Sequence, residues 1–192
     1  MIKDICKKFG IENYTINDDG SIDVQGNVDL SDMGLTKLPI KFRNVTGYFY
    51  CSYNQLVTLE GSPQRVGGDF YCNDNQLITL EGSPGEVGRD FYCYNNQLIT
   101  LEGGPQRVGG DFNCDDNQLI TLEGSPGVVG RDFYCDNNKL ITLEGGPQRV
   151  GRDFYCSLNQ LGLEYKGLYR SEEYSLLIKR INRHKKLDQL FS

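Results

Sequence analysis

Hydrophobic residues recur every 21 residues along most of this chain. Phenylalanine, cysteine, asparagine and leucine keep fixed positions in the unit, as in the stretch D-F-Y-C-N-D-N-Q-L-I-T-L that starts at Asp69. A phenylalanine and a cysteine separated by one residue put both side chains on one face of a strand and the intervening residue on the other. Self-similarity at this period predicts a repeat solenoid, in which each coil packs only on its neighbours.

The pattern predicts one short strand in each coil, and the strands stack as a parallel sheet. They are expected to start near residues 28, 49, 70, 91, 112, 133 and 154, the first belonging to a degenerate coil. The E-G-x-P segments predict tight bends, so the opposite side of the solenoid should be extended and rich in turns. The asparagine after each strand is expected to hydrogen-bond the backbone of the next coil.

Both ends of the solenoid need a cap. Residues 1–25 predict an N-terminal cap, with a short helix over 2–9 and a hairpin with strands at 14–16 and 22–24. Residues 26–163 form the solenoid, and residues 164–192 a C-terminal cap with a helix from Ser171. Its apolar stripe at helical spacing predicts packing on the last coil. A partner-binding role stays open for its basic face, which carries Lys179, Arg180, Arg183, Lys185 and Lys186.

The unit resembles the leucine-rich repeat, L-x-L-x-x-N-x-L-x-x-L, with phenylalanine and cysteine replacing the first two leucines. The match covers about residues 26–163 without insertions. It is most similar to short bacterial and phage-type repeats, and the E-G-x-P and V-G-G-D-F phrases resemble those of tailed-phage open reading frames. The resemblance implies a parallel sheet on a concave face, with that face as the usual ligand surface.

The net charge of −6 is unevenly distributed. Residues 166–192 carry seven basic and three acidic side chains, so the preceding residues carry a net charge of −10. An acidic body argues against binding of nucleic-acid phosphates, which leaves only the basic C-terminal helix for such a role. The charged N-terminus lacks the apolar region of a secretory signal, and no apolar run could span a bilayer. A soluble, cytoplasmic protein is therefore expected, in the host cytoplasm if the chain is phage-encoded.

Six of the seven cysteines occupy one position of the repeat. Cysteines in register form a line rather than a converging cluster, and the one histidine, His184, lies in the C-terminal segment. Packing in the core is therefore the favoured role, with reduced thiols. No serine or cysteine has a visible base partner, and the repeated glutamates follow from duplication. The sequence predicts no enzyme activity, no cofactor and no metal.

Three columns of residues are expected on the outer face of the strands, where we place the candidate partner-binding site. The first contains Asp69, Asp90, Asp111, Asp132 and Asp153; the second contains Tyr50, Tyr71, Tyr92, Asn113, Tyr134 and Tyr155; the third includes Tyr94, Asp115 and Asp136. Tyrosine is enriched at interfaces, and an aspartate row attracts basic groups. These columns predict a protein-interaction module whose partner has a basic or mixed-charge surface, with inhibition of a host defence or metabolic enzyme as one expected role.

Alternative explanations stay open at this point. The tyrosines can stack to stabilise the sheet, and the aspartates can pair with the arginines immediately before them, Arg89, Arg131 and Arg152. Binding of a small ligand, nucleotide or glycan is a second function, and an acidic DNA mimic or a structural virion or assembly protein is a third. Asn113, Tyr94 and the pair Asp115 and Asp136 depart from the repeat, so they are the candidate specificity positions.

Overall fold

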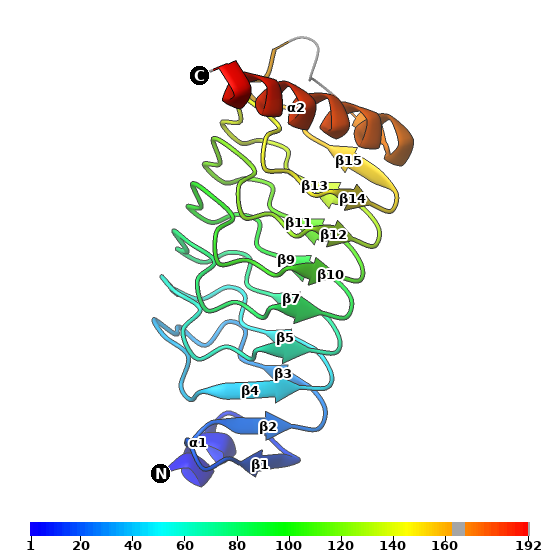
Figure 1. Cartoon of the computed structure of the whole chain (residues 1–192). Coiled ribbons are helices and arrows are strands. Elements are labelled where there is room, and N and C mark those ends of the chain that lie inside the picture. The colour runs from blue at the N-terminus through cyan, green and yellow to red at the C-terminus, as the bar shows by residue number, and fades with distance from the viewer. Residues whose placement is uncertain (163–167, 192) are drawn as a thin grey trace.

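The computed structural model, which describes residues 1–162 and 168–191, is a parallel β-solenoid closed by a C-terminal helix. Its coils follow one another from the N-terminus to the helix α2, which lies across the last coil (Figure 1). Paired strands of neighbouring coils are in register at the spacing of the repeat, so Phe70 pairs with Phe91 and Phe91 with Phe112. The predicted repeat solenoid is thus confirmed.

One sheet, here called the Phe-Tyr sheet, contains every strand predicted from the Phe-x-Cys pattern. Seven of its eight strands are parallel, and β16 joins β15 in antiparallel orientation. In chain order they are β3 (Val28–Asp29), β5 (Phe49–Tyr50), β7 (Phe70–Tyr71), β9 (Phe91–Tyr92), β11 (Phe112–Asn113), β13 (Phe133–Tyr134), β15 (Asp153–Tyr155) and β16 (Leu168–Arg170).

A second sheet, here called the Val sheet, lies in the segments predicted as extended and turn-rich. Its eight strands are β1 (Tyr14–Ile16), β2 (Ile22–Val24), β4 (Phe42–Val45), β6 (Arg65–Val66), β8 (Glu86–Val87), β10 (Arg107–Val108), β12 (Val128–Val129) and β14 (Arg149–Val150). The prediction of one sheet was therefore incomplete. The turn between the two sheets needs glycine, because a Cβ on Gly88 would lie 2.1 Å from the Gly67 carbonyl oxygen.

The core is a set of columns along the solenoid axis. The phenylalanine rings stack with centroids 5.5 Å apart at Phe49–Phe70 and 5.0 Å apart at Phe133–Phe154. The six cysteines of the repeat and the leucines of the L-I-T-L segments are buried beside them. Burying one such side chain contributes about 1.5–3 kcal/mol, so each added coil extends one continuous apolar core.

The buried asparagine of each coil connects that coil to the preceding one. Asn96 accepts the Leu77 N–H at 3.0 Å and donates to the carbonyls of Cys72 and Cys93, each at 3.1 Å. The expectation of a bond to the next coil therefore had the wrong direction. The reason is that two of the backbone groups beside the Asn96 amide, the Leu77 N–H and the Cys72 carbonyl, belong to the preceding coil.

Both ends of the solenoid carry the predicted helices and hairpin. The helix α1 (Ile2–Lys8) precedes the antiparallel pair β1 and β2, and α2 (Ser171–Phe191) follows β16. The Tyr174 ring stacks on Phe154 at 4.2 Å, so α2 continues the phenylalanine column. The predicted boundary at residues 163 and 164 lies outside the described residues, as do the side chains from residue 184 onward. No helix in the described part is long and apolar enough to cross a membrane.

Candidate functional site

The predicted site residues lie together on the outer face of the Phe-Tyr sheet. They alternate along each strand with buried phenylalanine and cysteine, so their side chains point away from the core. Parallel pairing in register keeps equivalent residues adjacent, as at Tyr71 and Tyr92 or Asn113 and Tyr134. The side chains of all three columns are half-buried against one another. We call this surface the Tyr-Asp face.

The tyrosine column forms two stacks of rings. Ring centroids are 4.6 Å apart at Tyr50–Tyr71 and 4.5 Å apart at Tyr71–Tyr92. Beyond Asn113, Tyr134 and Tyr155 stack at 4.6 Å. The tyrosines therefore stack as the structural alternative predicted, and stacked rings stabilise neighbouring strands. Each tyrosine of the two stacks is still partly exposed.

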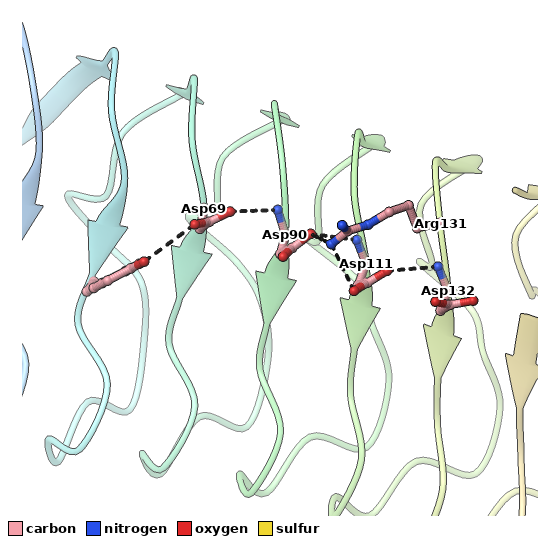
Figure 2. Close-up of polar contacts among 6 residues, drawn as sticks. Asp69, Asp90, Asp111, Arg131 and Asp132 are labelled. Atoms are coloured by element: carbon pink, nitrogen blue, oxygen red, sulfur yellow. Dashed lines mark hydrogen bonds and ion pairs between the residues drawn. The ribbon is translucent and has the colours of Figure 1, made fainter. Parts of the chain in front are cut away.

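The aspartate column is a continuous hydrogen-bonded row. Each carboxylate accepts the backbone N–H of the aspartate in the next coil, at 2.9 Å from Asp111 to Asp90 and 3.0 Å from Asp132 to Asp111. Figure 2 shows Asp69 and Asp90 in the same arrangement, at the start of the row. The Oδ1 atoms are fixed by the backbone, so the row presents carboxylates at constant spacing.

Arg131 lies along this row and not beside its sequence neighbour. Its guanidinium contacts Asp90 at 2.6 Å and Asp111 at 3.0 Å, in the two preceding coils (Figure 2). The predicted pairing of this arginine with the adjacent Asp132 was wrong, because its side chain extends back along the solenoid axis. Its Nε is a buried donor without a hydrogen-bond partner, so the two carboxylates hold the group at some cost in desolvation.

The third column contains a second carboxylate pair. Asp115 accepts the Asp136 N–H at 2.6 Å, and Asp136 accepts the Ser157 N–H at 2.5 Å. Burial raises the pKa of Asp115 to about 6, and the Asp136 carboxylate adds to this shift. Burial also raises the pKa of Asp136. The charge at this end of the face therefore changes near neutral pH.

The tyrosine hydroxyls stay protonated over the same pH range. Burial, together with the nearby Asp132 and Asp111 carboxylates, raises the pKa of Tyr134 to about 12. Burial likewise raises the pKa of Tyr94 to about 12. Tyr94 stands beside Tyr92 with ring centroids 6.2 Å apart. The face thus offers neutral phenols next to carboxylates, a surface suited to planar cations.

A shallow cavity of about 300 Å³ opens at the edge of the Tyr-Asp face. Asp69, Asp90, Arg89 and Arg131 line it, together with the glycine turns that lead into β9 and β11. The glycines add no side chains to this edge, so the cavity is formed by the aspartates and the two arginines.

A second exposed column was not predicted. It consists of apolar residues that are about half exposed, namely Val57 (49%), Ile78 (54%), Ile99 (55%), Ile120 (50%) and Ile141 (62%). The signal was present in the L-I-T-L segment, where two adjacent apolar residues cannot both face the core. These residues lie away from the Tyr-Asp columns in the unit.

The cysteine column has the environment of a core and not of a reactive site. All seven cysteines are free thiols and buried, and burial raises the pKa of Cys72 and Cys93 well above the usual value. Among the described residues, no group of three or more histidine, cysteine, aspartate or glutamate side chains is placed to hold a metal ion.

Comparison with known proteins gives no relative from which a function could be transferred. No protein-family model matches the chain, and no curated protein sequence matches it. The Tyr-Asp face is therefore interpreted from its own geometry.

Proposed function

We propose that this chain is a protein-interaction module that binds a basic or mixed-charge protein surface through the Tyr-Asp face. The observation that carries the proposal is the fixed array of stacked tyrosines beside a hydrogen-bonded aspartate row. Tyrosine gives large contact area at low entropic cost, and an ordered carboxylate row steers and orients a basic partner. Both groups are held by the solenoid before binding, which lowers the entropy cost of association.

We further propose that the repeat is of the leucine-rich type and phage-encoded, and that the partner is a host protein. The order of the Phe, Cys, Asn and Leu columns supports the relationship to leucine-rich repeats. A host defence or metabolic enzyme is the expected target, inhibited by occlusion of its surface.

The test compares capture of host proteins by three immobilised proteins. The first is the wild type and the second carries Tyr71→Ala, Tyr92→Ala and Tyr134→Ala. The third carries three substitutions of exposed glutamines near the Val sheet, Gln64→Ala, Gln106→Ala and Gln148→Ala. Bound proteins are identified by mass spectrometry and then titrated in purified form.

We expect the wild type and the glutamine variant to bind one partner equally. The tyrosine variant should bind it at least about tenfold more weakly, because interface tyrosines often contribute more than 1 kcal/mol each. Undiminished binding by a folded tyrosine variant rejects the Tyr-Asp face as the site. A thermal-shift screen with nucleotides and glycans tests the small-ligand alternative, which requires a stabilising compound.

A further inference from the structure

The tyrosine column of the Tyr-Asp face is interrupted at one strand, β11. Asn113 stands where the neighbouring strands carry Tyr92 and Tyr134, and it pairs with both in unbroken register. The backbone at this strand therefore follows its neighbours, and the difference is confined to the side chain. An asparagine is shorter than a tyrosine by most of the phenol ring.

The Asn113 side chain is also held close to its own strand. Its Oδ1 accepts the N–H of Asp115, two residues further along the chain, at 2.9 Å. The space above it, between the rings of Tyr92 and Tyr134, is a slot that we call the Asn113 slot. The two rings are separated by two strand spacings, or about 9–10 Å. Neighbouring tyrosines stack at 4.5–4.6 Å, so the slot has the thickness of one planar group.

The charge around the slot favours a cation. Three carboxylates of the aspartate row, Asp90, Asp111 and Asp132, stand beside these strands, against the single guanidinium of Arg131. Asp115 and Asp136 lie in the third column, on the other side of the slot. A planar group that enters here meets ring faces above and below and carboxylates at its edges.

The protein itself shows which cation this environment accepts. The Nη2 atom of the Arg131 guanidinium donates to both Asp90 and Asp111, so the row binds a guanidinium N–H donor between adjacent coils. Guanidinium also stacks on aromatic rings, and it forms paired hydrogen bonds with carboxylates that an ammonium group cannot match. An uncharged aromatic ring would fill the slot but would not balance the negative charge of these carboxylates.

We propose that the Asn113 slot receives an arginine side chain of the protein partner, stacked between Tyr92 and Tyr134. This inference rests on the proposed function and names the group that the Tyr-Asp face recognises. Asn113 is then a specificity residue, because it is the one position where the repeat opens the stack between two tyrosines.

The test uses short peptides as probes and nuclear magnetic resonance of the isotope-labelled full chain. Four peptides of the form acetyl-GSGXGSG-amide carry arginine, lysine, citrulline or tyrosine at X. We expect the arginine peptide to shift the resonances of Tyr92, Asn113 and Tyr134 in a saturable manner. Lysine and citrulline peptides should bind about tenfold more weakly, since they lose the planar cation or its charge. Added salt should weaken binding of the arginine peptide.

Two reciprocal variants locate the site. Asn113→Tyr restores the consensus residue and completes the stack, so it should remove the response while the fold is retained. Tyr71→Asn opens an equivalent slot between Tyr50 and Tyr92 and should add a second set of shifted resonances. Because both exchanges use residues already found at this position of the repeat, neither introduces a foreign side chain into the column.

The outcomes separate this inference from the proposed function. Equal affinity of Asn113→Tyr and wild type for the arginine peptide overturns the slot, as does the absence of any response to that peptide. Equal binding of the tyrosine and arginine peptides overturns the choice of arginine. If the slot fails while the purified partner still depends on Tyr71, Tyr92 and Tyr134, the proposed function stands without it. If the slot responds as expected and no partner depends on those tyrosines, only the proposed function fails.

Discussion

At the scale of single residues, one buried asparagine bonds several backbone groups at each turn that follows a Phe-x-Cys strand of the Phe-Tyr sheet. Asn96 bonds one N–H and three carbonyl groups, which belong to its own coil and the preceding one. Without these bonds the Leu77 N–H would be buried without a partner, and the carbonyls of Cys72 and Cys93 would each keep only one donor. A residue that looks like part of a turn is therefore a main connection between coils.

Replacing this asparagine should destabilise the protein strongly. Asn96→Ala leaves the Leu77 N–H unpaired, at a cost of about 1–3 kcal/mol, and removes one of the two donors to the carbonyls of Cys72 and Cys93. We therefore expect the free energy of unfolding to fall by about 3 kcal/mol. Urea denaturation measures the change. The control Gln97→Ala alters an exposed neighbour and should change stability by less than about 0.5 kcal/mol. Similar losses in the two variants would contradict the role of Asn96.

A second residue-scale prediction concerns the buried carboxylate of Asp115. Its pKa in the folded protein is about 6, against a usual value of 3.8, so the folded state binds this proton more tightly than the unfolded state. Ionised Asp115 therefore destabilises the fold above about pH 6, and this cost disappears as the pH falls toward 4.

Asp115→Asn retains the acceptor for the Asp136 N–H and removes the charge. It should raise the free energy of unfolding at pH 7.5 by about 1 kcal/mol or more, and by less than half as much at pH 4.5, where Asp115 in the folded protein is already protonated. Denaturation curves at the two pH values test this. Asp18→Asn is the matched control, since that carboxylate is exposed and its loss should matter little at either pH. A benefit that is equal at both pH values would show that the charge is not the cause.

At the scale of elements, the helix α2 completes the core by adding one more ring to the phenylalanine column. Tyr174 stacks on Phe154, and its hydroxyl donates to the Pro147 carbonyl at 3.1 Å. The helix contacts β14, β15 and β16, so it covers the ends of both sheets. One side chain thereby connects the helix to the core and to the bend before the last strand of the Val sheet.

Substitutions at Tyr174 should separate these two contributions. Tyr174→Ala removes the ring and should lower the free energy of unfolding by about 3–5 kcal/mol. Tyr174→Phe retains the ring and loses only the hydrogen bond, with an expected loss of about 1 kcal/mol. Leu176→Ala, at a position 69% exposed on the same helix, serves as control. Hydrogen exchange at Phe154 should accelerate in the alanine variant alone; unchanged protection there would argue against capping by Tyr174.

The elements also show what sequence patterns can predict. The Phe-Tyr strands and the cap hairpin were predictable, because alternation with a buried face leaves a clear trace at Phe-x-Cys and at Ile22–Val24. The two-residue strands of the Val sheet were not predictable, because a strand such as Arg65–Val66 is too short to show alternation. The columns of the face followed from the repeat period. The ion pairs of Arg131 with Asp90 and Asp111 could not be predicted, since a long side chain that crosses two coils has no local sequence signal.

At the scale of the whole molecule, the reactivity of the cysteine thiols shows whether the core is buried along the full length of the solenoid. Each cysteine of the repeat is fully buried in one column, and burial raises the pKa of those thiols. Since the thiolate is the reactive form, a native chain should not react with a thiol reagent at pH 8.

We expect fewer than about one labelled thiol per chain under native conditions. In urea all seven cysteines should react, and their labelling should follow the loss of circular dichroism signal. Mass spectrometry after brief exposure to a maleimide counts the modified residues. Stoichiometric labelling of the folded protein would show that part of the column is open.

The caps have a consequence for how far the architecture can extend. Every coil offers the same strand edges as its neighbour, so an uncovered end is a template on which another chain could continue the stack. Here β1 and β16 pair in antiparallel orientation with β2 and β15, and α2 lies against β14. Strands in reversed orientation interrupt the parallel register. A unit that could polymerise into a fibre of indefinite length is thereby limited to a discrete particle.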